Sequence, residues 1–213
     1  MCGSKTAIDY KQLYNQLAQD TLSHGLDNAW KNMEADDSLR AREVAKLIYM
    51  LHPKSVLEVA AGYGFVTHAI REYNPNVSMT CLEIATPFCD ILRNRGYNVI
   101  EENFITAQLE DKWDVVTIMQ VLEHLESQEI LRNVLVRVSS WAERYLIVEI
   151  PEGGPIDGER HILSLTDYRM EEILESIGLD VVFSKKIPPQ GGQITNGYTA
   201  MVQIVGMKGG CNG

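Results

Sequence analysis

A glycine-containing turn, followed by an acidic residue, is the first feature of this sequence that could do chemistry. The apolar run at 56–59 leads into a turn with Gly62 and Gly64, and Glu83 comes 19 residues after Gly64. Such a turn lets a cofactor approach the backbone, and roughly 20 residues later a carboxylate can accept hydrogen bonds from ribose hydroxyls. Any tight turn favours glycine and a strand end often carries a solvated charge, but the pair together predicts a ribose-containing cofactor.

Glu58 narrows the class of cofactor, because it lies inside the apolar run directly before the turn. A carboxylate at that point repels a pyrophosphate but attracts a ligand that bears an ammonium group. The third glycine of a dinucleotide site is replaced by Thr67. The residues therefore point to S-adenosyl-L-methionine rather than NAD.

A second group of residues with possible chemistry consists of Glu123, His124 and His161. The first two follow the apolar run at 114–119, and His161 follows a later run. If both runs are parallel strands, these side chains emerge at the same edge of a sheet. A carboxylate and imidazoles can hold a divalent ion, act as a metal-free acid or base, or make purely structural hydrogen bonds. We expect all three residues to be catalytic.

The elements that must position these residues follow from the hydrophobic pattern. Strands are predicted at 55–60, 78–83, 98–101, 114–119 and 145–150, with helices between them at 65–73, 87–95 and 128–141. This alternation is typical of βαβ units in a parallel sheet. After a helix at 167–177, the extended runs 179–187 and 197–207 are joined by a link too short for a crossover, so we expect them to pair antiparallel.

The order of these elements and motifs resembles the class I S-adenosylmethionine-dependent methyltransferases. Residues 56–64, 82–84 and 113–124 resemble the first, second and fourth family motifs, and 146–151 the strand that follows. The resemblance implies an α/β fold: a Rossmann-like, doubly wound, mostly parallel seven-stranded sheet with an antiparallel C-terminal hairpin strand and an N-terminal helical cap. The residues it assigns to the cofactor are Glu58, Ala60, Gly62, Gly64, Glu83, Ile84, Asn103, Phe104 and Gln120.

Two of these positions depart from the family pattern. Ala60 replaces the first glycine, which is a mild change if its φ is negative. Asn103 stands where an aspartate often receives the adenine amino group, and its carbonyl oxygen can accept the same bond. Ile84 and Phe104 are expected to wall the adenine, although core packing would explain either one alone.

Two branches of the family share a motif like residues 120–124. The ubiquinone-biosynthesis O-methyltransferases, which this sequence resembles most, have Glu-x-x-Glu-His and bind a metal. The small-RNA 3′-terminal 2′-O-methyltransferases add a downstream histidine similar to His161. Here the first position is Gln120, and a neutral amide is a poor ligand for a hard dication. We therefore expect no metal ligands, with a Mg²⁺ site as the less favoured alternative.

Composition limits the partners. The 213 residues include 29 acidic and 19 basic ones, for a formal charge of −10, which disfavours bulk nucleic-acid binding. We expect one domain over 1–213, with the cap at 1–50, the core at 55–207 and a disordered tail at 208–213. No secretory signal or membrane segment is visible and the four cysteines form no metal-binding pattern, which favours a cytoplasmic monomer or homodimer.

The sequence leaves several functions open. The favoured one is methyl transfer to a small-molecule hydroxyl or amine by in-line displacement. Terminal ribose 2′-O-methylation of RNA is an alternative within the family, and the net charge and Gln120 count against it. The others are a non-catalytic S-adenosylmethionine-binding module and an enzyme that cleaves or rearranges the cofactor.

Overall fold

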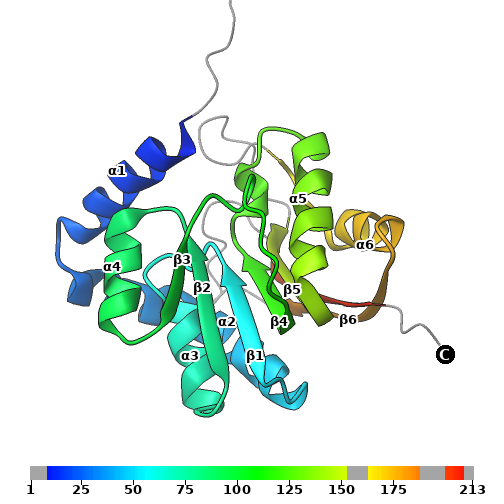
Figure 1. The fold of residues 1–213 in the computed structure, drawn as a ribbon, viewed down its shortest axis with the longest axis horizontal. Helices are drawn as coiled ribbons and strands as arrows, with labels where there is room; N and C mark the ends of the chain where they lie inside the picture. The colour runs from blue at the N-terminus through cyan, green and yellow to red at the C-terminus, as the bar shows by residue number, and fades with distance from the viewer. Residues whose placement is uncertain (1–8, 153–162, 188–199, 209–213) are drawn as a thin grey trace, which may run out of the picture.

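The computed structural model describes residues 9–152, 163–187 and 200–208, and it confirms the predicted fold class (Figure 1). One seven-stranded sheet has the strand order β3-β2-β1-β4-β5-β7-β6. The strands are β1 (Ser55–Val59), β2 (Ser78–Glu83), β3 (Asn98–Glu101), β4 (Trp113–Met119), β5 (Ala142–Glu152), β6 (Leu179–Ile187) and β7 (Ala200–Lys208). The predicted tail lies outside the described residues from 209 onward.

The parallel part of the sheet has its switch point at β1. Val56 of β1 is opposite Met79 of β2 on one side and Val115 of β4 on the other, and all these pairs are parallel. Successive connections lead away from β1 in opposite directions, and ligands of open α/β sheets bind in the crevice that this reversal creates. β7 runs antiparallel to both β5 and β6, so the predicted hairpin is confirmed.

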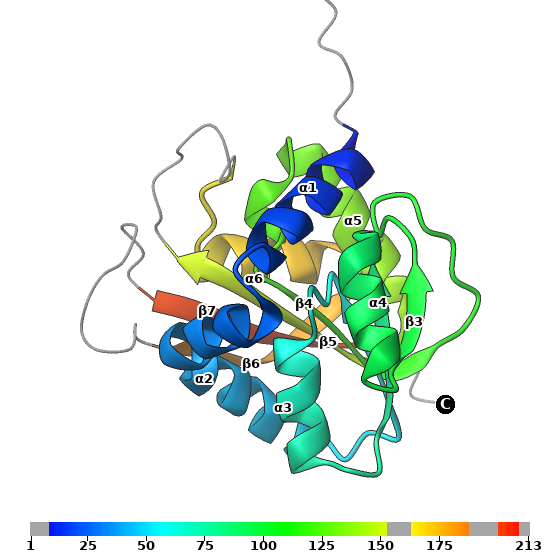
Figure 2. The same ribbon diagram turned by 90° about the vertical axis from the view of Figure 1, so that its left-hand side faces the viewer.

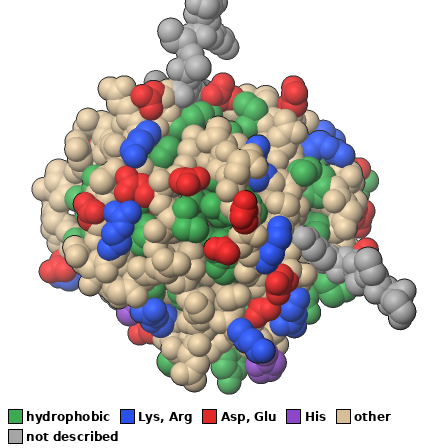
Figure 3. Space-filling view, viewed as in Figure 1, with side chains coloured by type: hydrophobic (Ala, Val, Ile, Leu, Met, Phe, Trp, Pro, Cys, Tyr) green, Lys and Arg blue, Asp and Glu red, His purple; other side chains and the backbone are tan. Residues whose placement is uncertain are grey.

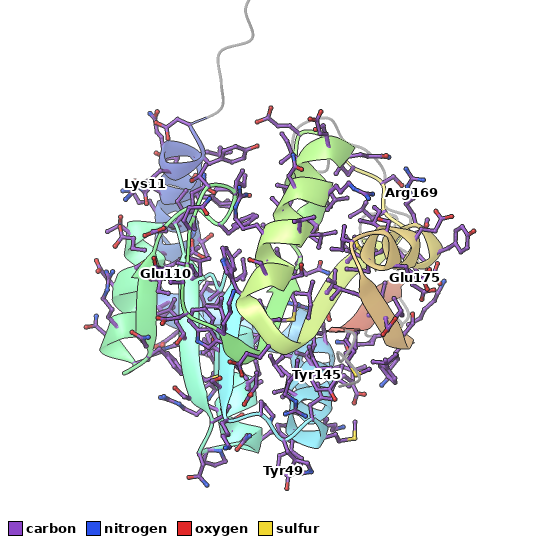
Figure 4. The ribbon with its side chains drawn as sticks, turned by 45° about the vertical axis from the view of Figure 1, so that its right-hand side comes forward. Lys11, Tyr49, Glu110, Tyr145, Arg169 and Glu175 are labelled. Atoms are coloured by element: carbon purple, nitrogen blue, oxygen red, sulfur yellow. The ribbon has the colours of Figure 1, made fainter. Side chains whose placement is uncertain are left out.

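Helices cover both faces of the sheet (Figures 1 and 4). On one face, α2 (Leu26–Met50), α3 (Phe65–Tyr73) and α4 (Thr86–Asn94) pack Ile48, Ile70 and Leu92 into the same buried cluster as Val56 and Val115. On the other, α5 (Gln128–Trp141) and α6 (Asp167–Ser176) bury apolar side chains against the remaining inward positions of the strands. Figure 4 shows Arg169 and Glu175 marking α6 on this side.

The helix α1 (Tyr10–Leu22) belongs to neither face, and it lies across the edge at which the parallel strands end (Figure 2). Its Ala18 is buried against Ala85 and Phe88, at the start of α4. Its Tyr10 hydroxyl donates to Glu126, 2.7 Å away, after the short 3-10 helix η1 (Leu122–His124). The helix therefore spans the crevice from α4 to η1. In the part of the chain that the structure describes, no helix is both long and apolar enough to cross a bilayer.

Candidate functional site

The glycine turn after β1 adopts left-handed backbone conformations at three positions. The φ angles are +57° at Ala60, +55° at Gly62 and +84° at Gly64. The condition under which alanine would be a mild change, a negative φ, is therefore not met: the turn keeps the conformation that glycine favours, and alanine adopts it at a cost of about 1–2 kcal/mol. The N–H of Ala60 donates to the Leu82 carbonyl at 2.8 Å, which ties the turn to β2 and helps to hold this conformation.

Glu83 connects the turn to the end of β2. One carboxylate oxygen accepts the Gly62 N–H, and the other accepts the N–H groups of Ile84 and Ala85, all at 2.8 Å. Burial raises the pKa of Glu83, while these backbone donors oppose the rise by stabilising the charge. A carboxylate has about four lone-pair sites, so the oxygen that binds Gly62 can accept a further hydrogen bond.

Glu58 lies beneath the turn and is almost fully buried. It accepts a hydrogen bond from the Thr67 hydroxyl, and burial raises its pKa to about 7 although this bond opposes the rise. It borders a cavity of about 170 Å³ at the switch point of the sheet, with Arg40, Ala60, Gly62, Met119 and Gln120 among its other walls. The structure thus brings four of the predicted cofactor residues, Glu58, Ala60, Gly62 and Gln120, around one cavity.

Arg40 is a residue of this cavity that the sequence reasoning missed. It is buried on α2, and its guanidinium lies 2.7 Å from the Glu149 carboxylate of β5. Gln203 of β7 donates to the other oxygen of Glu149, also at 2.7 Å. Arg40 and Glu58 give the cavity one cationic and one acidic group, which is the pair that an amino-acid zwitterion requires. No local motif marks Arg40, because its partner is 109 residues away.

A second cavity, of about 10 Å³, lies on the other side of Glu83 under α1. Ile84, Asn103 and Phe104, all predicted to contact the adenine, line it together with His124 of η1. The Asn103 side-chain oxygen accepts the Ile105 N–H at 2.9 Å, so it already has one local partner. The walls are mostly apolar with a few polar atoms, a lining that suits an aromatic base, but the cavity is too narrow to hold one unless α1 shifts. The remaining walls include Tyr10, Tyr14, Ile105, Val121 and Leu125.

Tyr10 and Tyr14 enclose this cavity from the side of α1, and neither was predicted to be part of the site. Burial, with the Glu123 and Glu83 carboxylates nearby, raises the pKa of Tyr14 to about 12, so its hydroxyl stays protonated. Burial and the hydrogen bond to Glu126 likewise raise the pKa of Tyr10. Their helical spacing indicated only that they share a face of α1, not what that face covers.

Glu123 and His124 share η1 but differ in exposure. Glu123 is 3% exposed, and its Oε2 has no hydrogen-bond partner among the described residues. Burial raises its pKa to about 7, and repulsion by Glu149 adds to the rise. His124 keeps 29% of its side chain exposed, with Nε2 3.8 Å from Glu123 Oε1. The pair therefore puts an imidazole at the crevice and a carboxyl group behind it.

The prediction for His161 lies outside the described residues. The described chain resumes at Leu163, whose N–H donates to the Glu123 carbonyl at 3.0 Å. Across the described ranges, no three His, Cys, Asp or Glu side chains are grouped closely enough to hold a metal ion. Gly64 lines neither cavity; it caps α3, where a Cβ would lie only 2.6 Å from Leu92 Cδ2.

The chain is similar to known methyltransferases in part of its sequence and in its fold. Residues 57–141 match the family model described as a methyltransferase domain. A search of curated proteins finds no matching relative by sequence. Among solved structures, the magnesium protoporphyrin IX methyltransferase of Synechocystis PCC 6803 with bound S-adenosylmethionine has a TM-score of 0.66 at 14% identity, over 97% of this chain and 100% of that one.

Two further solved structures are similar over most of their length. The 1,6-didemethyltoxoflavin-N1-methyltransferase of Burkholderia thailandensis has a TM-score of 0.66 at 16% identity, over 96% of this chain and 92% of that one. The glycopeptide N-methyltransferase MtfA has a TM-score of 0.65 at 18% identity, over 82% and 91%. At these identities the likeness establishes the shared fold.

Proposed function

We propose that this chain transfers the methyl group of S-adenosylmethionine to a small-molecule hydroxyl or amine, because residues 57–141 match a methyltransferase domain and the fold is that of the class I S-adenosylmethionine-dependent methyltransferases. The observation that carries the proposal is the pair of cavities on either side of Glu83, at the switch point of the sheet. One is narrow and apolar, and the other combines Arg40 with Glu58. Together they match a ligand that has a base, a ribose and an amino acid in that order.

The chain's own residues supply the contacts that such a ligand needs. The adenine would lie between Tyr14 and the wall formed by Ile84 and Phe104. The hydroxyl groups of its ribose would donate to the remaining lone pair of the Glu83 oxygen that binds Gly62. The ammonium and carboxylate of the methionine part would face Glu58 and Arg40. The sulfonium methyl would then lie between these two regions, where η1 reaches the crevice.

Methyl transfer is an in-line displacement. A lone pair on the acceptor oxygen or nitrogen forms the new bond to the methyl carbon, the carbon–sulfur bond breaks, and its electron pair stays on sulfur. Holding the two reactants in line supplies much of the rate. The acceptor loses a proton, and His124 is the exposed imidazole that can take it, with Glu123 positioned to stabilise the resulting imidazolium.

The small-molecule class of acceptor is supported by charge and by the neighbours. The formal charge of −10 opposes a polyanionic substrate. The solved structures of similar fold are named for porphyrin, glycopeptide and toxoflavin methylation. Two of these proteins are named N-methyltransferases, and at 16–18% identity this does not fix the acceptor atom of the present chain.

Calorimetric titration of the purified protein with S-adenosylhomocysteine tests the proposal, with NAD as the control ligand. We expect micromolar binding of S-adenosylhomocysteine and none of NAD. Glu83→Ala should weaken binding by about 1–3 kcal/mol, since ribose hydroxyls lose their partner, whereas Asp90→Ala on the exposed side of α4 should leave it unchanged. If well-folded protein does not bind S-adenosylhomocysteine, the proposed function is wrong and only the assignment of the fold remains.

A further inference from the structure

A basic and aromatic pocket lies on the flank of the molecule, apart from the two cavities described above. It has a volume of about 610 Å³ and opens between the first half of α2, the helix α3 and the turn before β3. Its walls include Trp30, Lys31, His68, Arg71, Arg95 and Tyr97. Small-molecule sites typically have volumes of about 300–1,000 Å³, so the pocket is large enough for one.

Two arginines of this pocket are held in place by aromatic rings. The Arg95 guanidinium carbon lies 4.1 Å from the centroid of Trp30, and that of Arg71 lies 4.3 Å from the centroid of Tyr97. A guanidinium stacked in this way keeps its N–H edge available, and its planar fork matches phosphate or carboxylate geometry. The rings thus fix two anion-binding groups before any ligand arrives.

Three cations of the pocket are Arg71, Arg95 and Lys31. Within the described residues, neither Arg71, Arg95 nor Lys31 forms an ion pair, and Arg95 spends one N–H on the Tyr63 carbonyl at 3.2 Å. Some exposed cations elsewhere in the described chain do have a carboxylate partner, as Lys46 has in Glu43, and Figure 3 shows acidic and basic side chains interspersed over one face.

The charge of the pocket is opposite to that of the chain. Three permanent cations face one lining carboxylate, Asp27, in a protein whose formal charge is −10. His68 is another wall, and its Nε2 lies 3.6 Å from the exposed Glu72 carboxylate. An excess of positive charge confined to one concave region attracts an anion of similar size.

We propose that this pocket binds a small molecule bearing a phosphate or pyrophosphate group. Its cations come from three separate elements and surround a common space. A dianionic group can contact more than one of them at once, whereas a single carboxylate carries less charge and fewer acceptor oxygens. A nucleic acid fits poorly, because the formal charge of −10 of the chain would repel the rest of its backbone. This site is separate from methyl transfer, and it adjoins the cofactor turn through Trp30 and Tyr63, whose ring centroids are 6.2 Å apart.

Inorganic pyrophosphate is the probe, and tryptophan fluorescence at constant ionic strength is the readout. The chain has three tryptophans, and Trp113 and Trp141 are buried in the cluster on the other face, so a ligand-dependent change reports on Trp30. We expect a saturable change, weakened roughly tenfold or more in Arg71→Gln and in Arg95→Gln. Lys31→Gln, on the exposed surface of α2, removes a cation without touching a stacked ring and should weaken binding by a smaller factor.

Arg144→Gln is the matched control. Arg144 also stacks on a ring, Tyr145, and donates to a backbone carbonyl, but it lies outside the pocket. The affinity of the Arg144→Gln variant for pyrophosphate should stay within about twofold of the wild-type value. The proposal is overturned if pyrophosphate gives no saturable change, if all four variants weaken alike, or if a short single-stranded oligonucleotide displaces pyrophosphate at far lower concentration. None of these results depends on S-adenosylmethionine binding, so failure here is distinct from failure of the proposed function.

Discussion

Two carboxyl groups, Glu58 and Glu123, are buried near the crevice with pKa values raised to about 7. Each loses more by leaving water than it regains from its neighbours. Such groups are uncommon outside functional sites, because an ionised carboxylate without full compensation destabilises the fold. At neutral pH both are poised between the charged and the neutral form, which is the condition that a proton-handling group requires.

Glu123→Gln should change the pH dependence of stability. A carboxyl group whose pKa is higher in the folded than in the unfolded state stabilises the protein fully below the unfolded value of 4.5, and this contribution is lost as pH rises through about 7. When the pH is raised from 5 to 8, the wild type should therefore lose on the order of 3 kcal/mol of unfolding free energy that the variant keeps. Urea denaturation at both pH values measures this, with the exposed Glu143→Gln as control. An identical pH dependence in both variants would contradict the burial argument.

His124→Ala should lower turnover and leave cofactor affinity nearly unchanged. We expect a loss of about 10- to 100-fold in kcat, at the low end for general acid–base catalysis, since positioning supplies much of the rate. Steady-state kinetics with an identified acceptor and titration with S-adenosylhomocysteine separate the two effects. His24→Ala, in the exposed link between α1 and α2, is the control. Full activity in His124→Ala would remove this residue from the mechanism.

At the scale of elements, Gly64 in the turn between β1 and α3 can be compared with Gly96 before β3, because the two have a similar φ but different surroundings. Gly64 has φ +84° and Gly96 has φ +77°, but only at Gly64 would a Cβ meet another side chain, Leu92. Gly64 combines a left-handed conformation with a close approach of α4. The turn therefore requires glycine at this position for two separate reasons.

Gly64→Ala should cost about 2–4 kcal/mol of unfolding free energy, because strain and a clash with Leu92 add up. Gly96→Ala has the strain without the clash, so about 1–2 kcal/mol is expected. Chemical denaturation of both variants gives the comparison. If the two costs are equal, the close approach of Leu92 has no energetic consequence.

The helix α1 is the element that limits access to the cavity under it. That cavity has about 10 Å³, far less than an adenine occupies, and Tyr10 and Tyr14 form its outer wall. Cofactor entry on this side therefore requires α1 to shift. The hydrogen bond from Tyr10 to Glu126 is the contact that holds the first turn of α1 against the segment after η1.

Tyr10→Phe should speed cofactor association while changing overall stability by no more than about 1 kcal/mol, since it removes one hydrogen bond and keeps the ring. Stopped-flow binding of S-adenosylhomocysteine measures the rate. Tyr49→Phe, at the exposed end of α2 and far from α1 in Figure 4, is the control. An unchanged association rate would mean that this hydrogen bond does not limit entry.

Over the whole molecule, a buried polar network joins elements that are distant in sequence. Arg40 of α2, Glu149 of β5 and Gln203 of β7 meet beneath the crevice. The network holds α2 to the part of the sheet where β5, which is parallel to β4, pairs with the antiparallel strand β7. Removing one member leaves a buried charge without its partner, which is strongly destabilising.

Arg40→Met should therefore cost about 3–5 kcal/mol. Adding Glu149→Gln should recover much of that loss, because the neutral amide keeps its shape and no longer needs a cation. Urea denaturation of both single variants and the double variant forms a double-mutant cycle. Simple additivity of the two losses would show that the pair is not coupled.

The sequence predicted the sheet well because strand and helix signals here are local. The bounds predicted for β2, β3 and α3 match the structure, and the short link correctly indicated the antiparallel hairpin. The candidate site could be predicted where a motif names the residue, as at Glu83. The φ of Ala60 and the place of Arg40 depend on tertiary contacts with Leu82 and Glu149, which no local pattern contains.

The described residues on either side of 153–162 lie next to each other. Glu152 forms a bridge with Leu165, and the Leu163 N–H donates to the Glu123 carbonyl of η1, so the residues after 162 are tied both to the end of β5 and to η1. A segment closed at its base can change in length at small entropic cost, roughly 0.6 kcal/mol for each doubling. A change in chain length between Glu152 and Leu163 should therefore leave the stability of the sheet and of the cofactor turn almost unchanged.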